Sequence, residues 1–190
     1  MNANAQNWVP GTPAALTSYA IMTWMSGAFM LGFVDASASY FAGIVAIVAF
    51  IPLFVTGVTS LRMGDLVGGN TFLYFSAFFA LGTGLCWLAQ FFAGIYGWAY
   101  DMRILGWEWL ILATVLTLTT PAFKRPRTVL VSISIVDVAL YISALLYLGV
   151  LGAAAAYIGG VLYFIAGLLA FYTAAAVMLG SVGIKLPIGA

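Results

Sequence analysis

Three polar side chains lie within one long apolar stretch of the chain, at the spacing of a single helical face. Ser134, Asp137 and Tyr141 are three and four residues apart, so a helix would align them along one stripe. A carboxylate near the middle of a membrane helix costs at least about 2.5–3.5 kcal/mol on insertion scales, and it normally faces a cavity or a partner. We therefore expect a pore wall or a polar seam here. A buried acid that only bonds a neighbouring helix is the structural alternative.

The expected form of Asp137 follows from the composition of the other apolar stretches. None of them holds a Lys, Arg or His that could pair with it, so desolvation favours the neutral acid. A neutral Asp137 could donate a hydrogen bond to a solute. Because the chain has no nucleotide site to drive a pump, we expect transport to be passive or coupled to an ion gradient, with protons as the partner.

Other kinds of chemistry lack the residues they need. The chain has no His, a single cysteine (Cys86) and no Walker-type glycine loop. These absences disfavour metal centres, nucleophile–base pairs and nucleotide-driven pumping. A net charge of +1 gives no electrostatic footprint for nucleic acid. We expect neither an enzyme nor a cofactor, a metal or a nucleic-acid partner.

The elements that would position these side chains are membrane helices. Of the 190 residues, 65% are hydrophobic and 6% charged, with a mean hydropathy of +1.14, whereas soluble domains are roughly 45–50% apolar and 25% charged. A bilayer-spanning helix needs about 20 apolar residues. Six stretches satisfy this: 13–34, 39–61, 71–97, 104–122, 128–150 and 153–180. We expect one all-α transmembrane domain over residues 1–190, surrounded by membrane lipids.

The charges between the stretches predict the orientation of the chain. Lys and Arg near span ends stay on the cytoplasmic side. With both termini inside, only Arg103 lies outside, and the cytoplasmic set is Arg62, Lys124, Arg125, Arg127 and Lys185. The prediction is a six-helix, N-in/C-in protein of the cell inner (plasma) membrane. Because no Lys or Arg precedes the first stretch, we expect it to be retained rather than cleaved as a signal peptide.

Three short motifs resemble those of a known family. The segment Thr12-Pro13-Ala14-Ala15-Leu16 resembles the Asn-Pro-Ala-Pro-Leu signature of the acetate uptake transporter family, which includes the succinate/acetate permeases. Gly69-Asn70-Thr71-Phe72 is similar to that family's Gly-Asn-Thr-Phe pattern. Leu186-Pro187-Ile188-Gly189 is similar to the tail that follows its sixth helix. The order of the motifs and the six-helix length extend the resemblance over the whole chain.

The resemblance implies a function and an assembly. Members of the family carry acetate, and some carry succinate, with protons or as channels; each protomer has its own pore, and six protomers form a ring. A homohexamer that carries small carboxylates is therefore implied here. Motif matching places the family's hydrophobic constriction near Ile21, Leu81 and Val136, and Val136 directly precedes Asp137. The donors expected along the path are Thr12, Asn70, Thr71, Ser134 and Tyr141.

Departures from the family pattern keep other functions open. Thr12 and Ala15 replace the family's Asn and second Pro, aliphatic residues stand at the expected gate where the family has bulky aromatics, and the loop near residues 62–68 is longer. The turn Asp101-Met102-Arg103 with Gly106-Trp107 resembles the amide and urea channels, which share the six-helix protomer. The alternatives are a passive channel for neutral solutes such as urea or short amides, and a membrane scaffold that transports nothing.

Overall fold

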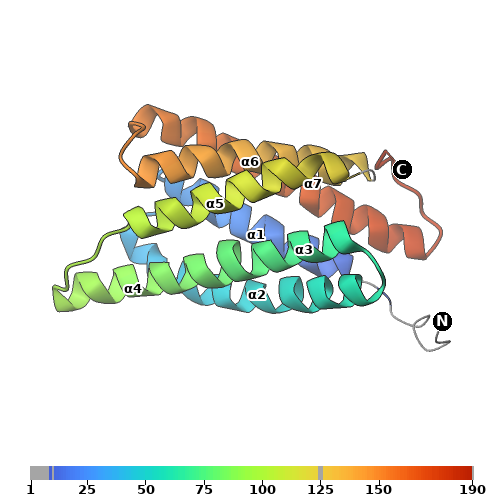
Figure 1. The fold of residues 1–190 in the computed structure, drawn as a ribbon, viewed down its shortest axis with the longest axis horizontal. Coiled ribbons are helices and arrows are strands. Elements are labelled where there is room, and N and C mark those ends of the chain that lie inside the picture. The colour runs from blue at the N-terminus through green and yellow to red at the C-terminus, as the bar shows by residue number, and fades with distance from the viewer. Residues whose placement is uncertain (1–8, 10, 124–125, 190) are drawn as a thin grey trace.

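The fold, seen in a computed structural model, is a bundle of helices (Figure 1). The structure describes residues 9, 11–123 and 126–189, and no strand occurs within these ranges. The helices are α1 (Thr12–Met30), α2 (Ser39–Arg62), α3 (Leu66–Tyr74), α4 (Thr83–Tyr96), α5 (Arg103–Thr119), α6 (Arg127–Tyr147) and α7 (Ala153–Ser181). A π-helical segment, Phe75–Gly82, joins α3 to α4 as one continuous rod, and short 3-10 turns span Ala36–Ala38 and Thr120–Ala122.

Six helical rods therefore follow one another along the described chain, with α3, the π-helical segment and α4 counted as one. Helix α1 begins and helix α7 ends near the same end of the bundle, which we call the terminal end; the opposite end is the far end (Figure 1). Helix α1 packs against α7 and α2, α6 packs against α5 and α7, and α2 also packs against α3 and α4. Which end faces the cytoplasm stays a prediction.

Five helical stretches in the described ranges are long and apolar enough to cross a membrane. They are Ala36–Arg62, Leu66–Tyr96, Arg103–Ala122, Arg127–Tyr147 and Ala153–Ser181. Helix α1 is not among them, because its Ser and Thr residues lower its hydropathy. Several of its polar side chains, such as Ser18, Thr23 and Ser26, are buried against other helices. An interior helix can carry hydroxyl groups that a lipid-facing helix would expose to hydrocarbon, so a sixth span over α1 stays a prediction.

Two of the expected boundaries are wrong by several residues. The third helix begins at Leu66 rather than at residue 71, because Asp65 caps it by accepting a hydrogen bond from the Gly68 amide (2.9 Å). The long loop expected near residues 62–68 is therefore mostly helix. Helix α1 ends at Met30 rather than at residue 34, and Gly32 then takes a positive φ of 70°. The remaining helix ends agree with the predicted stretches to within about three residues.

Pairs of glycines allow the helices to approach closely. A Cβ on Gly84 would lie 2.9 Å from the Gly43 carbonyl oxygen, and a Cβ on Gly43 would lie 2.8 Å from the Gly84 carbonyl oxygen. The crossing of α1 with α7 has the same reciprocal arrangement at Gly27 and Gly160. Small residues of this kind let membrane helices gain contact energy without a hydrophobic driving force.

Replacing one of these glycines should destabilise the bundle. We expect Gly84→Ala to lower the free energy of unfolding by about 1–3 kcal/mol, the usual cost of overpacking, because the new methyl group would meet both Gly43 and Ala46. Thermal unfolding of the purified protein in detergent measures the change. Gly94→Ala in the same helix is the control, since its Cβ would meet nothing within 4 Å. Equal stability of the two variants would contradict the close-contact explanation.

Candidate solute pathway

The terminal end of the bundle is hollowed by a wide mouth that leads into a narrow pocket. The mouth has a volume of about 600 Å³ and the pocket about 30 Å³. The smaller volume holds one or two water molecules. The two cavities share five lining residues and so adjoin: Leu16, Gly68, Phe72, Phe123 and Val129.

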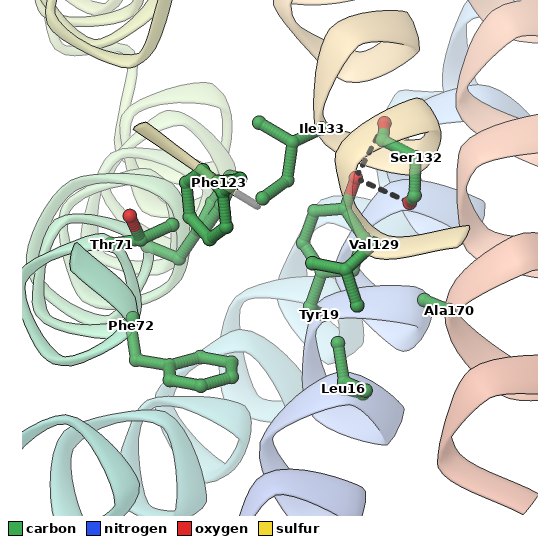
Figure 2. A pocket seen from close by; sticks show the side chains of 11 residues that line it. Leu16, Tyr19, Thr71, Phe72, Phe123, Val129, Ser132, Ile133 and Ala170 are labelled. Carbon is green, nitrogen blue, oxygen red and sulfur yellow. Dashed lines mark hydrogen bonds between the residues drawn. The ribbon is translucent and has the colours of Figure 1, made fainter. Parts of the chain in front are cut away.

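The polar groups in the narrow pocket are mostly bonded to the protein itself. The Tyr19 hydroxyl lies 3.4 Å from the Ser132 carbonyl oxygen and 3.3 Å from its Oγ (Figure 2). Ser132 Oγ donates to the Ala166 carbonyl (2.8 Å), and Thr71 Oγ1 donates to the Val67 carbonyl (2.8 Å). The pocket therefore offers an apolar surface with few donors or acceptors left to bond a solute.

A third cavity, of about 280 Å³, opens in the far half of the bundle between α1, α4, α5, α6 and α7. We call it the far-end cavity. It is lined by Ser26, Phe29, Met30, Trp87, Trp109, Ser143, Leu146, Tyr147 and Ala156. None of these side chains carries a formal charge at neutral pH.

A chain of aromatic rings separates the narrow pocket from the far-end cavity. Tyr19 and Phe75, which line the pocket, have ring centroids 4.8 Å apart. Phe75 lies 5.7 Å from Phe79, which lies 6.0 Å from Trp109, which in turn contacts Tyr147 at 5.4 Å. Trp109 and Tyr147 line the far-end cavity. Phe79 at the centre of this chain is fully buried, and the narrow pocket and the far-end cavity have no lining residue in common.

The π-helical segment sets the position of two of these rings. Phe75 and Phe79 both belong to it, and Thr83 Oγ1 at its end donates to the Phe78 carbonyl five residues earlier (3.1 Å). The same hydroxyl accepts from Trp109 Nε1 (2.9 Å), which ties the segment to α5. Such π-helical turns occur frequently at functional sites. No proline or polar cluster in residues 75–82 marks this segment in the sequence.

The three residues expected to form the gate occupy different surroundings. Val136 is fully buried in the core. Ile21 and Leu81 are only partly buried, and they line neither the mouth, the pocket nor the far-end cavity. As gate residues, all three stay predictions.

Two residues of the polar stripe on α6, Asp137 and Tyr141, contact α5 and the turn that follows it. Asp137 is 5% exposed and accepts a hydrogen bond from Thr120 Oγ1 (2.9 Å), while its second carboxyl oxygen is buried without a partner. The Tyr141 hydroxyl donates to Thr114 Oγ1 (3.3 Å). Ser134 is exposed and bonds the Leu130 carbonyl of its own helix. Asp137 and Tyr141 thus form part of a seam between α6 and the α5 region, and the role of the stripe in transport stays a prediction.

The donors expected from the other motifs lie near the terminal end. Thr12 lines the mouth and Thr71 lines the narrow pocket. The amide of Asn70 donates to the Leu66 carbonyl (2.8 Å), and Asn70 lines neither cavity. The structure therefore brings two of these three residues to the cavities of the terminal end.

The C-terminal tail closes back onto the start of α6 beside the mouth. The amides of Arg127 and Thr128 donate to the carbonyls of Gly189 (3.4 Å) and Ile188 (3.3 Å). The Tyr172 hydroxyl donates a hydrogen bond to the Pro187 carbonyl (2.9 Å). The tail carbonyls thus satisfy two amides that a helix N-terminus leaves open. Lys124 and Arg125, expected in the loop before α6, lie outside the described residues.

An ion pair joins the first residue of α5 to the loop that precedes it. Arg103 bonds Asp101 through its guanidinium (2.6 Å) and its backbone amide (3.0 Å). These hydrogen bonds from Arg103 lower the pKa of Asp101 to about 2, so this pair adds no net charge near neutral pH. Within the described ranges, no group of three His, Cys, Asp or Glu side chains could hold a metal ion.

The fold and the apolar helices define a multi-pass helical membrane protein. Comparison with solved structures finds a bacterial acetate channel, SatP, with a TM-score of 0.68 and 18% sequence identity, covering 96% of this chain and 100% of that one. No protein-family model matches the chain, and no curated protein matches it in sequence. The shared fold agrees with the resemblance that the three motifs indicate.

Proposed function

We propose that this protein carries acetate and related small carboxylates across a membrane through each protomer, as a member of the acetate uptake transporter family. The observation that carries the proposal is the pair of cavities that enter one bundle toward opposite ends and stop on either side of a buried chain of aromatic rings. Such an arrangement is expected of a closed path with a hydrophobic constriction. The constriction then consists of Tyr19, Phe75, Phe79 and Trp109, with Val136 in the same core.

The fold shared with an acetate channel supports this proposal, as do the positions of the motifs. The segments that resemble the family signatures contribute Thr12 and Thr71 to the cavities of the terminal end. The Leu186–Gly189 tail lies against the first residues of α6 at the same end. The resembling residues thus gather around one entrance, although they are far apart in the sequence.

The membrane, the orientation and the assembly are further parts of the proposal. Arg62 and Lys185 belong to the terminal end, together with Arg127, and Arg103 belongs to the far end. The positive-inside bias then places the terminal end in the cytoplasm. A homohexameric ring in the inner (plasma) membrane is supported by the family resemblance.

Uptake into proteoliposomes tests the function. We expect labelled acetate to enter vesicles that contain the protein faster than protein-free vesicles. Stimulation by an imposed pH gradient, acid outside, would indicate proton-coupled uptake, whereas uptake that follows the membrane potential would indicate an anion channel. Labelled urea is measured in parallel. Urea flux without acetate uptake would indicate a channel for neutral solutes instead. If neither solute entered, the protein would be a membrane scaffold that transports nothing.

A further inference from the structure

One residue that lines the far-end cavity has a buried hydroxyl without a partner in the protein. This residue is Ser26, which is 2% exposed. Serine on a helix usually donates to the carbonyl four residues earlier, as Ser143 does to Ala139 (2.9 Å) and Ser134 does to Leu130 (2.9 Å) in this bundle. Ser26 makes no such bond. The protein itself therefore leaves the hydrogen-bonding capacity of Ser26 unused.

We propose that the far-end cavity binds the uncharged form of a small solute, a protonated monocarboxylic acid or its amide, through the hydroxyl of Ser26. The inference rests on the proposed function, because it specifies what that pathway holds on its far side. The volume of about 280 Å³ lies near the lower bound of the roughly 300–1,000 Å³ of small-molecule pockets. It leaves room for a solute of a few heavy atoms. Phe29, Leu146 and Ala156 provide an apolar wall for its methyl group.

Two other polar groups of the cavity, on Ser143 and Trp109, are already bonded within the protein. Ser143 Oγ donates to its own helix and lies 3.1 Å from the Tyr163 hydroxyl. Trp109 Nε1 donates to Thr83. Among the described residues, three buried side chains have an oxygen without a partner, Ser26, Ser39 and Asp137. Of these, only Ser26 lines the far-end cavity.

The charges around the cavity favour an uncharged solute. A buried anion requires a cation or several donors, and the lining of the cavity has no cation. On α5, the carboxylate of Glu108 lines a different cavity, with Tyr74 and Phe78. In the loops of the far end, Arg103 is paired with Asp101, and Asp35 accepts from Ser37 in its own turn. Tyr147 is the titratable group in the lining itself.

Acetamide provides the sharpest probe, because it has the shape of acetic acid and stays uncharged at every pH. We expect protein-dependent acetamide flux in proteoliposomes, independent of pH, and acetate flux that follows the concentration of the neutral acid. Protein-free vesicles give the background that is subtracted. Ser26→Ala should lower both fluxes about fivefold, the effect of losing one neutral hydrogen bond.

Ser39→Ala is the matched control. Ser39 has the same kind of buried, unpartnered hydroxyl at the start of α2, and it does not line the far-end cavity. We expect wild-type fluxes for Ser39→Ala, and unchanged thermal unfolding for both variants. Acetate flux without acetamide flux would overturn this inference and leave the proposed function intact. Wild-type acetamide flux in Ser26→Ala would overturn the role of Ser26, and the absence of both fluxes would overturn the proposed function.

Discussion

Replacing Phe79 by alanine should open the barrier and weaken the fold at the same time. The Phe79 ring is fully buried and contacts the rings of Phe75, Trp109 and Tyr163, with centroids 5.7–6.1 Å away. Its removal leaves a void between the narrow pocket and the far-end cavity. A buried Phe→Ala substitution costs about 3–5 kcal/mol. Because a hydrophobic constriction restricts passage by its width and dryness, we expect acetate flux to rise roughly tenfold or more.

Two further variants make this prediction decisive. Phe79→Leu keeps most of the apolar volume, so it should retain stability better and raise the flux less. Phe92→Ala removes a ring from α4 that is 37% exposed on the outside of the bundle, and its flux should match that of the wild type. Flux in proteoliposomes and thermal unfolding in detergent are measured for each variant. A folded Phe79→Ala protein with wild-type flux would place the barrier elsewhere.

The helical architecture could be predicted from the sequence because lipid imposes a length on apolar segments. Five of the six predicted stretches coincide with helices that can cross a membrane. Helix α1 also forms where expected. Its polar residues are buried against other helices such as α2 and α7, so its hydropathy is lower than that of a helix that faces lipid. The early start of α3 depends on a cap, because Asp65 bonds the Gly68 amide. In the sequence, position 65 falls within the loop that is predicted near residues 62–68.

The candidate pathway was harder to predict because it depends on contacts between distant segments. Motif matching gave Ile21, Leu81 and Val136, whereas the rings between the two cavities come from α1, the π-helical segment and α5. The spacing of Phe75 and Phe79 is a local signal that the two share one helical face. Nothing in the sequence pairs Phe79 with Trp109, since that contact depends on how α5 packs.

The polar stripe on α6 was predicted correctly as a set of residues on one helix, but its surroundings could not be predicted. Asp137 lies on the same helix as Ser134 and Tyr141, as the spacing indicates. The threonine that bonds it comes from the turn that follows α5. Whether the stripe faces a pore or a neighbouring helix depends on the rotation of α6 in the bundle, which a periodic pattern alone does not fix.

Removing the hydroxyl of Thr120 should destabilise the protein more than removing that of Thr114. Thr120 Oγ1 is the described partner of the Asp137 carboxyl, whose other oxygen has none. Thr120→Val would remove the hydrogen bond to one oxygen of a buried carboxyl whose other oxygen is unpartnered, which costs about 1–3 kcal/mol. Thr114→Val is the matched control, because it breaks a longer bond (3.3 Å) to Tyr141 at an exposed position. Thermal unfolding of the two variants compares them directly.

Variants of Asp137 and Thr120 distinguish a structural role of Asp137 from a role in proton transfer. Asp137 lines none of the three cavities of the pathway, so we expect Asp137→Asn to keep the pH dependence of acetate flux. If the acid serves to hold α6 against the turn after α5, the double variant Thr120→Val with Asp137→Leu should recover much of the stability lost in Thr120→Val, because no buried polar group is then left unpaired. A changed pH dependence in Asp137→Asn, with unfolding unaltered, would instead support the proton role that the sequence predicts.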